Sequence, residues 1–178
     1  AGDKNWGDMP PYRNLGMTAV GNVEEDFLLG NIGAGYGAAA GRIKGGLGSA
    51  SLVSDDGIQV GAVFAVNPVG SVLVPGTRHF WAWALEQQGE FGGLGAPEIS
   101  ADIPLDMPAE SRLAENTTIG VVATNVTLTK SEAKRIAIMA HDGLARAIRP
   151  VHTPFDGDSI FALSTEKIEL SGPRAMGV

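Results

Sequence analysis

Residues 115–124 read Glu115-Asn116-Thr117-Thr118-Ile119-Gly120-Val121-Val122-Ala123-Thr124. An Asn-Thr bond therefore stands directly before a β-branched apolar run that is typical of a buried strand. If the bond before Thr117 is broken, Thr117 becomes a new N-terminus that carries both a hydroxyl and a free α-amine. Such an amine titrates near ~7.7–8.0 in model peptides, so it can serve as the base that activates the hydroxyl. The alternative is that Thr117 simply begins an ordinary, uncleaved strand. Evidence from the rest of the sequence is needed to choose between these two interpretations.

The composition indicates a single globular domain. The chain has 178 residues, of which 44% are hydrophobic and 19% charged, enough for one sizeable core. A net charge of −7 argues against nucleic acid and anionic membranes as partners. The absence of cysteine excludes disulfides, thiolate catalysis and cysteine-ligated zinc. With no signal-peptide pattern and no apolar run of membrane-spanning length, we expect a cytoplasmic protein.

The residues before this stretch predict a helix, a glycine-rich segment and a hairpin. A short helix is expected to begin within 14–19 and to continue at 24–29. Residues 30–48 hold too many glycines for a long regular element. The two strands of the hairpin are predicted at 49–53 and 58–66, around an Asp55-Asp56-Gly57 turn. Residues 60–66 are apolar on both faces, which predicts a strand covered on both sides.

The residues on either side of the Asn-Thr bond predict a linker and then a helix and strand. Residues 75–115 lack periodicity, as in an exposed linker before a processing site, with its aromatic side chains anchoring it to the surface. Thr129 and Glu132 form a capping-box pattern, and apolar residues recur at helical spacing until Pro150. A last strand is predicted at 159–164. Together these elements predict a layered α/β architecture.

The polar residues that offer chemistry are few. Asp156 and Asp158 flank Gly157 in the turn before the last strand and could orient an ammonium group and the Thr117 hydroxyl; a solvated acidic turn is an equal alternative. Lys44, within the glycine-rich segment, could stabilise an anion, although a surface lysine is commoner. Asn67, at the abrupt end of a strand, could donate to an oxyanion or simply end the strand.

Two other patterns predict less. Residues 33–38 match the loose dinucleotide fingerprint G-x-G-x-x-A, with Asp55 near the expected acidic position, but no clear strand precedes them and no clear helix follows. His79, His141 and His152 show no ligand spacing, so we expect no metal and no cofactor, and we interpret His141 as structural.

Three segments carry a resemblance to a known family: GAGYGAAAGRIKGGLGSAS at 33–51, GAVFAVNPVG at 61–70, and the block from Asn116 to Thr165. They resemble the P1 family of peptidases, the DmpA-like N-terminal-nucleophile hydrolases, which includes D-aminopeptidases, β-peptidyl aminopeptidases and nylon-oligomer hydrolases. Thr117 after the Asn and the Asp-Gly-Asp turn bring the chain nearest to the nylon-oligomer hydrolases. The resemblance implies a four-layer αββα sandwich, here incomplete at both ends. The alternatives are that the chain is a fragment, that it has further parts, or that a second polypeptide completes the fold. It also implies a homo-oligomer, a tetramer in the family.

The resemblance assigns roles to single residues. It implies self-cleavage between Asn116 and Thr117 into parts 1–116 and 117–178, with Thr117 as the nucleophile. Asp156 and Asp158 would be the orienting carboxylates, and Asn67 the oxyanion-binding or amine-binding residue.

The family lysine maps onto Lys44, with Arg42 as the alternative. The implied activity is hydrolysis of amide bonds in small peptides or 6-aminohexanoate oligomers. An aminopeptidase, an acyltransferase and a processing-dead relative are the alternatives.

Overall fold

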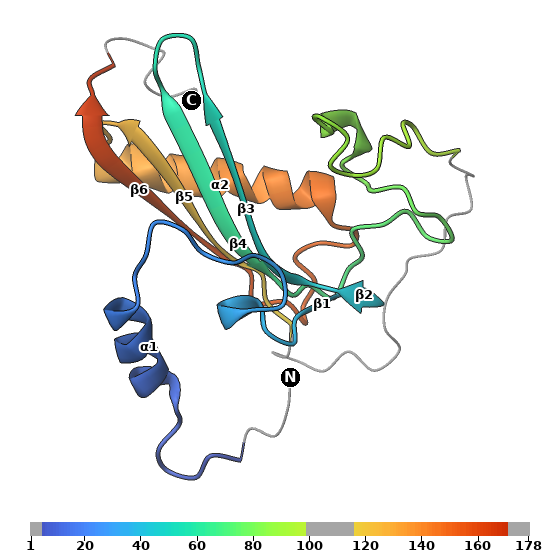
Figure 1. The fold of residues 1–178 in the computed structure, drawn as a ribbon, viewed down its shortest axis with the longest axis horizontal. Helices are drawn as coiled ribbons and strands as arrows, with labels where there is room; N and C mark the ends of the chain where they lie inside the picture. Colours follow the sequence, from blue (N-terminus) through green and yellow to red (C-terminus); the bar gives the residue numbers. More distant parts are fainter. Residues whose placement is uncertain (1–4, 99–115, 171–178) are drawn as a thin grey trace.

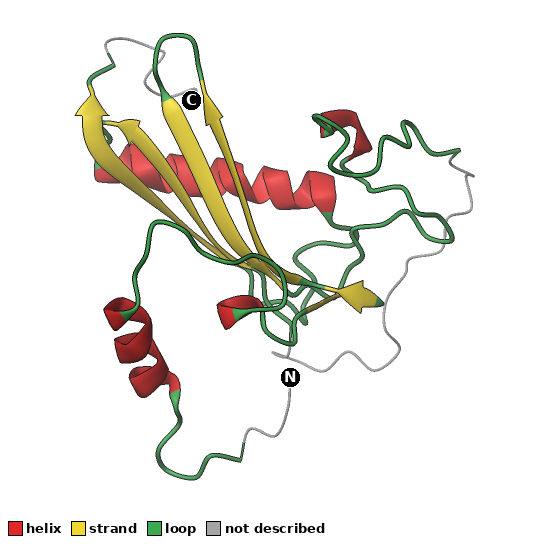
Figure 2. Cartoon of the chain, in the orientation of Figure 1, coloured by secondary structure: helices red, strands yellow, loops and turns green. Residues whose placement is uncertain are grey.

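The computed structural model describes residues 5–98 and 116–170, and its centre is one mixed β-sheet (Figure 1). Four strands lie in the order β3-β4-β5-β6, with bounds Gly46–Val53, Gln59–Val66, Ile119–Val126 and Ser159–Ile168. The β3–β4 and β4–β5 pairs are antiparallel, whereas β5 and β6 are parallel. Helix α2, Lys130–Ala147, connects the two parallel strands and lies across one face of the sheet (Figure 2). The predicted α/β class is therefore confirmed.

The start of α2 is fixed by the predicted capping box. The Thr129 side chain accepts from the Glu132 amide, and the Glu132 carboxylate accepts from the Thr129 amide at 2.8 Å. These hydrogen bonds from Thr129, side chain first and backbone second, hold the pKa of the Glu132 carboxyl below its ordinary value. Leu144 is the helix residue buried most completely against the sheet.

The hairpin of β3 and β4 is also confirmed, and its turn is closed by an amide of Ser54 that donates to the Ile58 carbonyl at 2.9 Å. β3 begins at Gly46, three residues earlier than predicted. The glycine-rich segment before it forms three short elements, η1 (Gly33–Gly35), β1 (Ala39–Ala40) and β2 (Ile43–Lys44). This is not the strand–turn–helix of a dinucleotide site.

Gly45 lets this segment approach the end of β4. A Cβ on Gly45 would lie 2.1 Å from the carbonyl oxygen of Val66, so only glycine allows the contact. The β1–β2 pair is thereby held beside Asn67, the first residue after β4.

The two faces of the sheet are unequal. Val60, Val122 and Thr124 face Ile136 and Met139 of α2. Strand residues alternate between faces, and the opposite face carries Ile119, Phe161 and Leu163, which are 49%, 62% and 45% exposed. Helix α2 lies mainly against β5 and β6, and η1 contacts one face of β3 and β4. Most of β4 is half-buried, so within the described residues its predicted cover on both sides is only partial.

The first helix and the predicted linker, residues 75–115, differ in part from the prediction. Helix α1 runs from Tyr12 to Gly21, with no buried residue, and residues 24–29 are not helical. Within the predicted linker, residues 75–98 contain the short turn η2, Trp83–Leu85, and the remainder, 99–115, lies outside the described residues. Its aromatic side chains do serve as anchors: Phe80 stacks on Phe91, and Arg149 lies 4.3 Å from the Trp81 ring centre.

Among the described helices, none has both the length and the apolar character needed to cross a lipid bilayer.

Candidate active site

Three backbone groups around the Asn116–Thr117 bond are held by hydrogen bonds. The amide of Thr117 donates to the carbonyl of Asn67 at 2.8 Å, and the carbonyl of Asn116 accepts from the amide of Gly157 at 3.0 Å. One residue further on, the amide of Thr118 donates to Oδ1 of Asp158 at 2.8 Å. The bond is therefore fixed from three directions, by the ends of β4 and β5 and by the turn before β6.

The Thr117 hydroxyl lies against the bond that precedes it. Its Oγ1 donates to the carbonyl oxygen of Asn116 at 2.5 Å. The side chain is half-buried. The neighbouring residue, Thr118, is fully buried, and its hydroxyl has no partner within the described part of the chain. Of the two adjacent threonines, Thr117 is the one whose hydroxyl is placed for chemistry at the bond.

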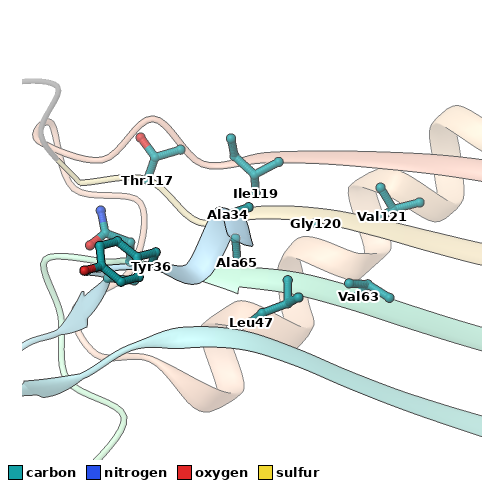
Figure 3. Close-up of a pocket in the computed structure, with 12 residues that line it drawn as sticks. Ala34, Tyr36, Leu47, Val63, Ala65, Thr117, Ile119, Gly120 and Val121 are labelled. Carbon is teal, nitrogen blue, oxygen red and sulfur yellow. The ribbon is translucent and has the colours of Figure 1, made fainter. Parts of the chain in front are cut away.

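A largely apolar cavity of about 410 Å³ opens beside Thr117. Figure 3 shows Thr117 at one end of it, with Ile119, Ala65, Val63 and Leu47 continuing along the uncovered face of the sheet. Its other wall comes from η1 and the residues after it, including Tyr36. This wall was not predicted from the sequence, in which the unusual density of glycine at residues 30–48 was the one sign of close backbone packing.

Asn67 contributes with both its backbone and its side chain. Its carbonyl holds the Thr117 amide, and its Oδ1 accepts from the amide of Ala39 in β1 at 2.9 Å. The residue also lines the cavity. Because an amide oxygen only accepts, any donation by the Asn67 side chain to a developing oxyanion has to come from Nδ2.

Asp158 connects the bond to a pair of histidines. Its side chain is only 3% exposed, and its Oδ2 lies 2.7 Å from Nδ1 of His152. An ionised carboxylate can only accept, so His152 donates from Nδ1. Nε2 of His152 lies 3.2 Å from Nδ1 of His141 on α2. His152 adopts a positive φ of 53°, which is uncommon for a residue other than glycine.

Sequence reasoning missed this histidine pair. The separation of eleven positions between His141 and His152 corresponds to no ligand spacing, and the crossover from α2 to β6 brings the two rings together. The structural role of His141 stays a prediction.

Asp156 is tied to the loop beyond β4. Its Oδ1 accepts from the amide of Val69 at 2.9 Å, and its Oδ2 accepts from the amide and hydroxyl of Thr153 at 3.0 and 2.5 Å. Asp156 thus links the segment that carries Asn67 to the turn that carries Asp158. Both carboxylates border a hollow of about 500 Å³ that also includes His141 and His152.

Lys44 lies outside the cavity, although its partner in the β1–β2 pair is Ala39, whose amide donates to Asn67. It ends β2, it is exposed, and neither it nor Arg42 lines the cavity beside Thr117. The structure therefore brings together Thr117, Asn67, Asp156 and Asp158, but not Lys44. Across the two described ranges, 5–98 and 116–170, no group of three or more His, Asp or Glu residues is arranged to hold a metal ion.

Comparison with known proteins gives consistent results. A model for "Peptidase family S58" matches residues 11–176. The chain is 42% identical over 171 residues to an uncharacterized aminopeptidase of Mycobacterium tuberculosis, covering 94% of this chain and 48% of the relative. It is 30% identical over 169 residues to a 6-aminohexanoate-oligomer endohydrolase of Kocuria sp., covering 90% and 46%. The chain thus spans about half the length of the curated relatives it matches.

Two solved structures share the fold. The PH0078 protein of Pyrococcus horikoshii matches with a TM-score of 0.53 and 27% identity, over 84% of this chain and 36% of that one. The L-aminopeptidase D-Ala-esterase/amidase of Ochrobactrum anthropi, a variant of the N-terminal-nucleophile hydrolase fold, matches with a TM-score of 0.52 and 24% identity, over 83% and 36%.

Proposed function

The chain belongs to peptidase family S58, and we propose that it is the catalytic part of an N-terminal-nucleophile amide hydrolase that cleaves its own Asn116–Thr117 bond. The observation that carries the proposal is the 2.5 Å contact between the Thr117 hydroxyl and the Asn116 carbonyl oxygen, at a bond held by three hydrogen bonds. A nucleophile already oriented beside a carbonyl removes much of the entropic barrier to attack.

The proposed self-cleavage has two steps. Oγ1 of Thr117 bonds to the carbonyl carbon of Asn116, the C–N bond breaks, and the hydroxyl proton passes to the released amine. The resulting ester between Asn116 and Thr117 is then hydrolysed by one water, which leaves a carboxylate on Asn116 and restores the hydroxyl. The new α-amine, with a pKa near ~7.7–8.0, can then act as the base for attack on substrates.

The surrounding polar residues take supporting roles in this proposal. Asp158 holds the backbone after the nucleophile and, with His152, positions a negative charge near the new amine. Asp156 fixes the strand end that carries Asn67, and Asn67 donates from Nδ2 to the oxyanion or binds an amine. The assignment of the family lysine to Lys44, or to Arg42 in its place, rests on the resemblance alone.

The cavity supports a substrate with an aliphatic chain beside its amide bond. Its walls of Ala, Val, Leu and Ile side chains suit methylene groups, while the carboxylates close to Thr117 favour a nearby ammonium group. Oligomers of 6-aminohexanoate have both features, and the relative of that name supports internal cleavage. The higher identity to an uncharacterized aminopeptidase favours a second candidate, removal of N-terminal residues.

The uncovered face of the sheet supports a further part of the proposal. Exposed Ile119, Phe161 and Leu163, in a chain that spans about half of its relatives, are expected to pack against a second sheet supplied by another segment or polypeptide. Assembly into a homo-oligomer is proposed from family resemblance only.

Intact mass of the purified protein tests the central step. Cleavage gives two fragments, whose masses correspond to one chain that ends at Asn116 and another that begins at Thr117. An uncut, inactive chain indicates a processing-dead relative. Thr117→Val keeps the side-chain shape and removes the hydroxyl, so it should abolish cleavage. Thr118→Val makes the same change one residue on and should leave cleavage intact. The reverse pattern would assign the nucleophile to Thr118.

A substrate panel separates the remaining candidates. Linear and cyclic 6-aminohexanoate oligomers, amino-acid p-nitroanilides and an added acyl acceptor are compared with the cleaved protein. Cleavage of cyclic oligomers requires internal hydrolysis. Release of single N-terminal residues with oligomers untouched indicates the aminopeptidase, and product formed only with the acceptor indicates a transferase.

A further inference from the structure

The residue between the two carboxylates, Gly157, contacts both reacting groups of the proposed self-cleavage. Its amide donates to the carbonyl oxygen of Asn116 at 3.0 Å. This oxygen is the atom that becomes negatively charged when Thr117 attacks the carbonyl carbon. Backbone amides that already point at such an oxygen stabilise the charge without any rearrangement.

The missing side chain of Gly157 has a separate effect. A Cβ built at this position would lie 2.9 Å from Oγ1 of Thr117 and 3.8 Å from its Cγ2. The first distance is shorter than a normal contact between carbon and oxygen, so the hydroxyl would have to move. The backbone of Gly157 does not have a positive φ, so glycine is not required there for backbone conformation. The space for the nucleophile is what distinguishes glycine from alanine at this position.

We propose that Gly157 is a catalytic residue of the self-cleavage: its amide is the oxyanion donor to the Asn116 carbonyl, and its lack of a Cβ leaves room for the attacking Thr117 hydroxyl. This inference rests on the proposed cleavage at Asn116–Thr117. In the balanced reaction, the amide of Gly157 gives up no proton. It keeps its hydrogen bond to the oxygen while the Oγ1–C bond forms, and the electron pair returns from that oxygen when the C–N bond breaks.

The same contact has a purely structural interpretation. Asn116 and Asp156 form a parallel β-bridge, and the amide of Ser159 donates to the Thr118 carbonyl at 3.0 Å as the next bond along the same pair of segments. A ladder bond and an oxyanion donor have the same geometry before reaction. They differ in what happens to the rate when the bond is removed, because a ladder bond acts on stability alone.

The experiment removes the donor and fills the space separately. In the full-length protein, glycolate in place of Gly157 turns the preceding amide into an ester, which deletes the N–H without adding a side chain. The matched control makes the same amide-to-ester change at Ser159, which deletes the neighbouring ladder bond. Gly157→Ala keeps the N–H and adds the Cβ. Its matched control is Gly143→Ala on α2, where a Cβ would meet nothing within 4 Å.

Self-cleavage is followed by the appearance of the two fragments on a denaturing gel, and folding by thermal unfolding of each uncut protein. The ester at 157 should slow cleavage by roughly 10²–10³, the range for loss of one oxyanion donor, while the ester at 159 changes the rate less than about tenfold. Gly157→Ala should slow cleavage while Gly143→Ala cleaves at the native rate.

Equal cleavage rates for the two esters would overturn the donor role, and native-rate cleavage by Gly157→Ala would overturn the requirement for space. If the ester at 157 fails to fold, Gly157→Ala still decides the second point, and slow cleavage by a folded alanine variant supports the assignment of Gly157 to the reaction. Thr117→Val, measured in parallel, keeps the two proposals apart. If it is cleaved like the native protein, the proposed function fails; if it stays uncut while both Gly157 variants cleave normally, only this inference fails.

Discussion

Asparagine in place of Asp158 separates the charge of this side chain from its shape. In the native site, Oδ1 accepts from the Thr118 amide and Oδ2 from Nδ1 of His152. The amide oxygen of an asparagine can keep the first bond. Its NH₂ group then faces His152 and can only donate, so His152 has to move its proton from Nδ1 to Nε2. Nε2 would then donate to His141, and both rings would keep their places.

The effect of Asp158→Asn on stability should be small and its effect on rate large. A hydrogen bond to a charged group contributes about 1.5–3 kcal/mol and a neutral one about 0.5–1.5 kcal/mol. The hydrogen bonds to the Thr118 amide and to His152 both change from charged to neutral, which lowers the free energy of unfolding by about 2 kcal/mol. Removal of a buried charge offsets part of that loss. Loss of a positioned acid–base partner, in contrast, slows reactions by roughly 10²–10⁴.

Two measurements on the same samples check this. Thermal unfolding gives the change in stability, and turnover of an amide substrate by the self-cleaved protein gives the rate. Asp142→Asn is the matched control, since Asp142 is exposed and borders the same hollow; it should cleave the substrate at the native rate. If Asp158→Asn also cleaves the substrate at nearly the native rate while Asp158→Ala does not, the acid–base role is refuted and Asp158 is only an anchor for the Thr118 amide.

Five further changes test individual contacts. Asn67→Ala should lower turnover by roughly 10²–10³ if Nδ2 is an oxyanion donor; a change in KM alone would favour amine binding instead. His152→Ala should lower kcat about 10–100-fold with KM unchanged, the equivalent of one charged hydrogen bond, and an unaltered kcat would show that Asp158 needs no second partner. Asp156→Ala should reduce both self-cleavage and thermal stability, because the amides of two loops lose their acceptor; native values of both would leave Asp156 as a surface turn residue. Thr129→Ala should lower the free energy of unfolding by about 1 kcal/mol without altering cleavage. The depressed pKa of Glu132 means that its contribution to stability is present above its unfolded pKa and is lost as pH falls through the folded value. In Glu132→Gln the melting temperature should therefore fall less on acidification than in the native protein, and parallel curves would contradict the capping box.

The elements that the sequence predicted well are those with a local cause. The capping box at Thr129, the Asp55-Asp56-Gly57 turn and the continuous apolar, β-branched runs each act through neighbours in the chain, so their positions were predicted within a few residues. Residues 24–29 were wrongly expected to continue the first helix. Their apolar side chains, Phe27, Leu28 and Leu29, are consecutive and exposed, so within the described residues no buried face stabilises a helix there.

The site was predictable only where one residue type carries the chemistry. Thr117 and the Asp-Gly-Asp turn could be singled out as candidates, because a hydroxyl after an asparagine and a pair of carboxylates are recognisable in the linear sequence. The bond between His152 and Asp158 could not, because it depends on the crossover that brings α2 and the turn before β6 together. Burial of β4 was overestimated for a related reason: an apolar run predicts that both faces are covered, but not that the same chain covers them.

The proposed cut also changes what kind of molecule unfolds. Asn116–Thr117 lies between β4 and β5, which pair along six residues in the middle of the sheet. Before cleavage, this pairing closes a loop within one chain, and refolding does not depend on concentration. After cleavage the same pairing joins two chains. Once they separate, the apolar edge of β4 is unpaired, and reassembly with β5 becomes a second-order reaction that depends on concentration. Such fragments aggregate more readily than they recombine. Maturation would therefore turn a reversible fold into one whose lifetime is set by how slowly the two strands part.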